Sequence, residues 1–139
     1  MSSRSRARQF AVQMLYQIQL TGQHVDDLRD GFWNREKADP KTRSFSEALV
    51  EGVLENIAEL DLEIGAYAKN WSVERMAIVD RIVLQIGLYE LIHHQDVPWK
   101  VVADEVVTLA RLFSSEQSTS FINGIIHAWG TNNRLEVTP

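Results

Sequence analysis

The segment from residue 78 to residue 130 restricts the fold most, because its apolar residues recur at helical spacing in three successive stretches. In the first, 78–91, they fall on two stripes of the helix, which is typical of a helix packed on both sides. The second starts at Pro98, whose fixed φ suits a first helical turn. The third follows a capping box of Ser114 and Gln117 and ends at Gly130. Short joints separate the three, so we expect an antiparallel bundle.

The remainder of the chain continues the helical pattern, with almost no alternation of period two. Four further elements are predicted: a first helix ended by Gly22, a short helix over 26–33, a long helix opened by Ser44 and Glu47, and a helix capped by Asp61. A polar loop containing Pro40 covers 34–43. The fold class is therefore all-α, a compact bundle of about seven helices in one domain, 1–139.

Composition excludes several classes of protein. A hydrophobic content of 45% in 139 residues supplies one core, and the absence of cysteine rules out disulfides and thiolate metal sites. No apolar run approaches the roughly 20 residues needed to cross a bilayer. The amino terminus lacks the apolar core of a signal peptide. We therefore expect a cytoplasmic protein that makes no membrane contact.

Charge is distributed unevenly along the chain. The net charge is −5, yet residues 1–25 hold Arg4, Arg6 and Arg8 and no acid, so this segment carries +3 and the rest −8. Such a basic end can touch a nucleic-acid backbone locally, while the acidic body suits a basic protein. The alternative interpretation is a frayed, solvated terminus.

No signature of catalysis or of a cofactor is found. Glu90 and His93 have the spacing of half a dimetal site in a helical bundle, but the other half is missing, so we predict a solvated helix end and no metal. The serines near residue 115 lack a histidine base close in sequence and lie in no nucleophile elbow. We expect no catalytic residue and no cofactor.

Several blocks together resemble one family. They are Leu15-Tyr16, Val79-Asp80-Arg81, Leu88-Tyr89-Glu90-Leu91, Asp96-Val97-Pro98, Glu105, Leu109-Ala110-Arg111, Phe113 and Phe121-Ile122-Asn123-Gly124. Their order and spacing resemble the NusB family of bacterial transcription antitermination factors over nearly the whole chain. Each block alone is weak evidence for the family, whereas the whole series in this order is specific.

The resemblance implies RNA binding at two places. NusB proteins have an arginine-rich amino terminus that binds the boxA element of leader or ribosomal RNA, which makes Arg4, Arg6 and Arg8 candidates for phosphate contacts. The family's Phe-x-Asn-Gly block lies near the RNA, so Phe121 could stack on an unpaired base and Asn123 could bond a base edge. Gly124 is expected inside a helix, where it permits close approach of another backbone.

The resemblance also implies a protein partner. Tyr16 is expected beside a NusE-type small-subunit ribosomal protein or the RNA, and Asp80 is expected to face a basic residue of that protein. The heterodimer would hold boxA-type RNA, and the ribosomal protein would link it to the transcription elongation complex. Such a role is scaffolding without covalent chemistry.

Departures from the family pattern fall on the functional side. Ser120 stands where a lysine or arginine is common, and Gln117 stands where an acid is common. The rival hypothesis is therefore a NusB-like protein-interaction module or homodimer with weak or lost RNA binding. A third reading, the amino-terminal domain of ribosomal RNA methyltransferases, conflicts with a sequence that has no catalytic domain. Homodimerisation stays open.

Overall fold

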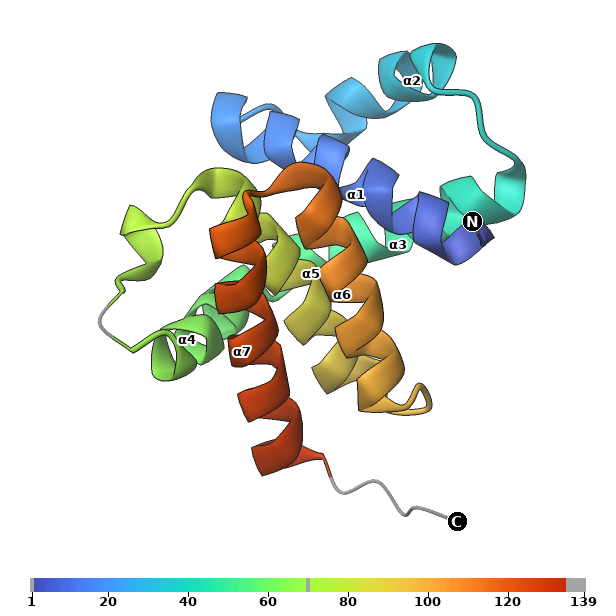
Figure 1. Ribbon diagram of the computed structural model, residues 1–139. Helices are drawn as coiled ribbons and strands as arrows, with labels where there is room; N and C mark the ends of the chain where they lie inside the picture. Colours follow the sequence, from blue (N-terminus) through green and yellow to red (C-terminus); the bar gives the residue numbers. More distant parts are fainter. Residues whose placement is uncertain (1, 70, 135–139) are drawn as a thin grey trace.

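The computed structural model describes residues 2–69 and 71–134, and within them the protein is all-α, as predicted. Its seven α-helices and one short 3₁₀ helix follow one another with brief connections (Figure 1). They are α1 (Ser3–Thr21), α2 (Val25–Arg35), α3 (Pro40–Glu55), α4 (Ile57–Tyr67), η1 (Val73–Arg75), α5 (Ile78–His93), α6 (Trp99–Phe113) and α7 (Glu116–Asn133).

Helix α5 is the central element, which confirms the prediction from its two apolar stripes. It packs against α1, α3, α4, α6 and α7, and all residues from Ile82 to Leu88 are buried. Helices α6 and α7 lie antiparallel on one side of α5, while α1 and α3 cross it on the other (Figure 1).

Some predicted helix boundaries are wrong for identifiable reasons. Helix α3 begins at Pro40 rather than at Ser44, because the Asp39 side chain caps the Thr42 amide and proline tolerates the first turn. This bond is the main reason why the pKa of Asp39 lies below its usual value, and the nearby Arg6 charge acts in the same direction. The cap of α7 is Ser115, which accepts from the Ser118 amide, rather than Ser114.

The sequence predicts helix ends at Gly22 and Gly130, and the structure confirms only the first. Gly22 ends α1 with φ of 75°, a left-handed conformation that suits glycine. Gly130 lies inside α7, which continues to Asn133. Because the Trp99 ring lies directly on Gly130, a side chain there would collide with it. Gly130 therefore serves packing between α6 and α7 rather than helix termination.

Candidate functional site

The amino-terminal turn of α1 carries two exposed arginines. The Ser2 hydroxyl caps the helix by accepting from the Ser5 amide, so the helix includes both Arg4 and Arg6. The Arg4 guanidinium lies 5.0 Å from the centre of the Phe45 ring, and that of Arg6 lies 5.2 Å from the centre of the Phe10 ring. Both cations are thus held over aromatic faces at the surface instead of extending freely into solvent.

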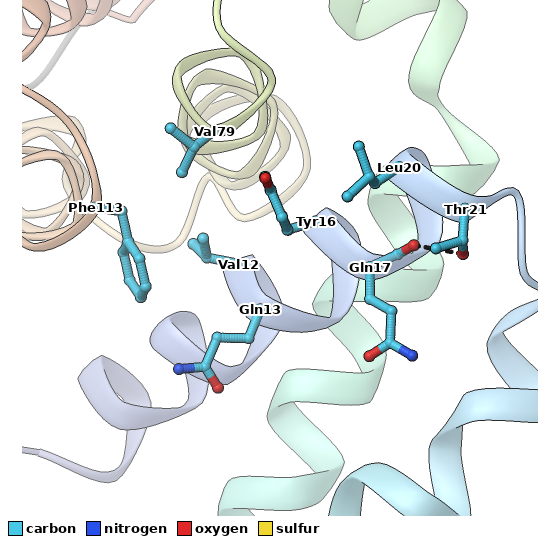
Figure 2. A pocket seen from close by; sticks show the side chains of 8 residues that line it. All are labelled: Val12, Gln13, Tyr16, Gln17, Leu20, Thr21, Val79 and Phe113. Carbon is cyan, nitrogen blue, oxygen red and sulfur yellow. Dashed lines mark hydrogen bonds between the residues drawn. The ribbon is translucent and has the colours of Figure 1, made fainter.

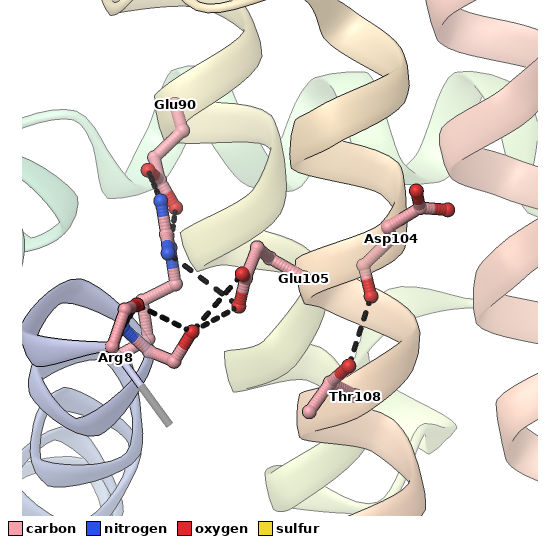
Figure 3. Close-up of polar contacts among 7 residues, drawn as sticks. Arg8, Glu90, Asp104, Glu105 and Thr108 are labelled. Atoms are coloured by element: carbon pink, nitrogen blue, oxygen red, sulfur yellow. Dashed lines mark hydrogen bonds and ion pairs between the residues drawn. The ribbon is translucent and has the colours of Figure 1, made fainter.

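Arg8 does not fit the expectation of a phosphate contact, because the structure places it inside the molecule. It is only 4% exposed, and its Nε and Nη2 atoms donate to the two carboxylate oxygens of Glu90 at 2.8 and 2.7 Å (Figure 3). Glu105 lies 3.5 Å away on its other side. Burial by itself lowers the pKa of Arg8, but the hydrogen bond and charge of Glu90, helped by Glu105, outweigh burial and raise it.

Glu90 was expected at a solvated helix end, and this expectation is wrong. Its side chain is 1% exposed and is committed to Arg8. The Ser5 hydroxyl donates to Glu105, with both carboxylate oxygens within 3.0 Å, so the same network reaches the first turn of α1. Four residues from three helices therefore fix the direction in which the turn bearing Arg4 and Arg6 points.

A second group of candidate residues lies where the beginnings of α5 and α7 meet. Phe121 is half-buried, and its ring centre lies 6.1 Å from that of the exposed Trp71. The two rings line a hollow of about 250 Å³ together with Asp80 and Gln117. The Asp80 carboxylate accepts from the Ser118 hydroxyl at 2.8 Å, which orients the acid toward α7.

Asn123 and Gly124 lie within α7, as predicted from the helical spacing around them. Asn123 is half-buried, and Gly124 is exposed. The prediction that another backbone approaches Gly124 closely is wrong within this chain, because a methyl group added there would meet no described atom within 4 Å. The roughly 1 kcal/mol that glycine costs a helix relative to alanine therefore has no compensation in packing.

This open space yields a prediction on stability. Gly124→Ala should raise the free energy of unfolding by about 1 kcal/mol, because alanine favours the helix and meets no obstacle. Urea unfolding followed by circular dichroism measures the change. Gly22→Ala is the matched control and should destabilise, since its φ of 75° disfavours a side chain. A loss of stability at Gly124 would show that this position is constrained within the fold.

Tyr16 lines a larger groove between α1, α5 and α6. Its side chain is 43% exposed, and the groove holds about 580 Å³. Figure 2 shows the side chains of Tyr16, Val79 and Phe113 converging on it from three helices, with Leu20 along the wall. A half-exposed phenol in an apolar groove can pack against a partner and still donate a hydrogen bond.

The fold brings some candidate residues together and separates others. Val79 lines the Tyr16 groove and Asp80 lines the Phe121 hollow, so the first turn of α5 divides two adjoining depressions. Glu90, which holds the arginine-bearing turn, lies ten residues further along α5, a rise of about 15 Å. Trp71 was not predicted as a site residue, because nothing in its local sequence distinguishes an exposed tryptophan from a core one.

The two positions that depart from the family pattern, Gln117 and Ser120, also lie at the surface near Phe121. Gln117 faces the hollow of Asp80 and Phe121, and Ser120 lines a neighbouring polar hollow of about 400 Å³. Arg111 lines that same polar hollow and is exposed. A cation from α6 therefore lies close to the position where Ser120 replaces a basic residue.

The described residues form neither a cluster suited to a metal ion nor a membrane-spanning helix. In residues 2–69 and 71–134, His, Asp and Glu form no group of three or more suited to a metal ion. Across the same described ranges, no helix combines the length and apolar content needed to span a bilayer.

Comparison with known proteins shows similarity along nearly the whole chain. The chain is 39% identical to the transcription antitermination protein NusB of Sorangium cellulosum (strain So ce56) over 91% of this chain and 90% of that protein. It is 40% identical to the protein of the same name from Anaeromyxobacter dehalogenans (strain 2CP-1 / ATCC BAA-258), over 90% and 88% of the two chains.

Solved structures share the fold. NusB of T. maritima superposes with a TM-score of 0.84 at 28% identity, covering 94% of this chain and 92% of the other. A chain from the crystal structure of antitermination factors NusB and NusE in complex with double-stranded RNA gives 0.85 at 25% identity, over 95% and 98%. Because the family model described as NusB matches residues 5–129, in addition to these relatives, the chain belongs to the NusB family.

Proposed function

We propose that this protein is an RNA-binding transcription antitermination factor that holds boxA-type RNA together with a NusE-type small-subunit ribosomal protein. The observation that carries the proposal is the match, over nearly the full length, to proteins named for antitermination and to a chain crystallised with NusE and RNA. In this proposal binding is the whole activity, and the ribosomal protein links the RNA to the transcription elongation complex in the cytoplasm.

The RNA would contact two parts of the surface. Arg4 and Arg6 would neutralise phosphates, since both are exposed and held on an ordered helical turn. Phe121, Asn123 and Gly124 would meet unpaired bases, for which the neighbouring Trp71 ring offers a second stacking surface. Arg111 would supply the phosphate contact that Ser120 cannot make. Arg8 is left out of this set because Glu90 already takes up its charge.

The protein partner would occupy the groove of Tyr16. This groove has apolar walls for burial, and Asp80 next to it supplies a negative charge for a basic partner residue. Self-association through the same apolar groove is the rival outcome, and it would leave the protein as an interaction module or homodimer without RNA binding.

The test is a fluorescence titration of labelled boxA-type RNA with the full chain, with and without the ribosomal protein, over a range of salt concentrations. We expect saturable binding that weakens as salt rises, because phosphate contacts release counterions. If no saturable signal is obtained at low salt even with the partner, the rival hypothesis holds. Sedimentation of the chain alone then shows whether it forms a homodimer.

Asp80→Lys should separate partner binding from RNA binding. Reversing the charge should weaken association with the ribosomal protein about tenfold or more, since like charges then face each other across the interface. RNA affinity should be unchanged or slightly higher. Parallel titrations with the partner and with RNA measure the two effects.

Two control variants make this result interpretable. Asp80→Asn removes the charge but keeps an acceptor for Ser118, so it separates loss of charge from loss of this hydrogen bond. Asp104→Lys makes the same charge reversal at an exposed position on α6. Equal losses of RNA and partner binding in Asp80→Lys would remove Asp80 from the partner site.

A further inference from the structure

A row of flat side chains extends from the arginine-bearing turn, and only its first member, Arg4, belongs to a candidate site already described. It begins with Arg4 on α1, crosses Phe45 on α3, and ends on three rings at the end of α5. We call it the ring row, and its members are Arg4, Phe45, His94, Tyr89 and His93.

Each member of the ring row contacts the next. The Phe45 and His94 ring centres are 6.5 Å apart, and those of His94 and Tyr89 are 5.4 Å apart. Tyr89 and His93 stack at 4.9 Å with an interplanar angle of 28°. With the Arg4 guanidinium 5.0 Å from the Phe45 centre, the row is continuous across three helices.

The packing beneath the ring row keeps its rings at the surface. Tyr89 lies directly on Gly52 of α3, where any side chain would collide with the ring. Phe45, Tyr89 and His94 are half-buried, and the His93 side chain keeps 35% of its surface exposed. The ring row is therefore most exposed at its two ends, Arg4 and His93, and partly exposed between them.

We propose that the ring row is a second contact surface for single-stranded RNA, on which bases flanking the boxA-type element stack. Rings and guanidinium planes are the groups that bind unpaired bases without strong sequence preference. The inference rests on the proposed function, because the occupant is identified by continuity: Arg4 belongs both to the phosphate-binding turn and to the ring row.

The surrounding charges agree with a nucleic-acid strand that enters at one end. Lys41 is exposed one helical turn before Phe45, so it lies on the same face of α3 and adds a cation near Arg4. At the opposite end, Glu59 on α4 lies 3.8 Å from His93 Nε2. This carboxylate repels phosphate, so the bound strand ends at His93.

The experiment compares two boxA-type RNAs, one of which carries a short unpaired extension containing a 2-aminopurine. Full-length protein with the ribosomal partner is titrated with each. His93→Ala combined with His94→Ala should weaken binding of the extended RNA about tenfold, because the bases of the extension can no longer stack on these two rings. The affinity of the double variant for the unextended RNA should stay within about twofold of that of the unsubstituted protein. The unsubstituted protein should quench 2-aminopurine fluorescence, and the double variant should not.

His127→Ala is the matched control, because His127 also packs against an aromatic ring, Trp99, but lies on α7 outside the ring row. Thermal unfolding of each variant shows whether the fold is kept, and Phe45→Leu gives a second variant that preserves apolar volume.

The outcomes distinguish this inference from the proposed function. If the unsubstituted protein binds the unextended RNA but gains nothing from the extension, or if both histidine replacements leave the extended RNA unaffected, the ring row does not bind RNA. If the unsubstituted protein binds neither RNA, the proposed function fails and this inference fails with it. An equal loss for His127→Ala would also contradict a local contact.

Discussion

Replacing Glu90 with glutamine is expected to lower the free energy of unfolding by about 3 kcal/mol or more. Glu90 is 1% exposed and Arg8 is 4% exposed, so the substitution leaves a guanidinium in the interior without its main counter-charge. Glu105 lies farther from Arg8, at 3.5 Å, and is partly solvated, so it compensates only in part. Urea unfolding monitored by circular dichroism measures the loss.

Two further variants test the physical reason for this effect. Glu105→Gln should cost less, about 1 kcal/mol, because the amide oxygen can still accept from Ser5 and only a partly exposed charge near Arg8 is lost. The double replacement Arg8→Met with Glu90→Leu should recover most of the stability lost in Glu90→Gln, since neither buried charge remains. A Glu90→Gln protein as stable as the unsubstituted chain would contradict the importance of the buried pair.

Converting Arg4 and Arg6 to alanine is expected to weaken binding of boxA-type RNA about 25-fold at 0.1 M salt. Each phosphate contact with a single strand contributes about 0.7 to the slope of log affinity against log salt, so two lost contacts should reduce the slope by about 1.4. Extrapolation to 1 M salt should give similar affinities for both proteins. Fluorescence titration across a salt series measures both quantities.

A matched double variant controls for net charge. Arg35→Ala with Lys37→Ala removes two exposed cations near the end of α2, and it should leave the slope within about 0.3 of that of the unsubstituted chain. Arg8 is kept in these proteins, because its loss would leave the buried Glu90 carboxylate without its partner and disturb folding. An unchanged slope after loss of Arg4 and Arg6 would remove the amino-terminal turn from the RNA site.

The role of Arg8 could not be predicted from its position in the sequence. Helical spacing correctly places Arg4 and Arg8 on one face, and both guanidinium groups lie near the same Phe45 ring. The carboxylate that pairs with the buried Arg8 belongs to Glu90, which lies 82 positions away in the sequence. Local patterns contain no information on such a pairing, so three similar arginines divide into two surface cations and one structural cation only when the fold is known.

Helix packing was more accessible to prediction than helix ends. The two apolar stripes of residues 78–91 correctly predicted that α5 is central. At Pro40 the sequence offered a loop signal and a helix-start signal together, and the Asp39 cap decides in favour of the helix. The close contact between Gly130 and Trp99 likewise depends on the crossing of α6 and α7 rather than on local propensity.

The central claim, that one chain holds RNA and a ribosomal protein at the same time, is tested most directly by a binding cycle. RNA affinity is measured with and without saturating NusE-type protein, and partner affinity with and without saturating RNA. We predict a complex with one copy of each component, in which either ligand leaves the affinity for the other unchanged or raises it, by the same factor in both directions. Displacement of either ligand by the other would contradict the account.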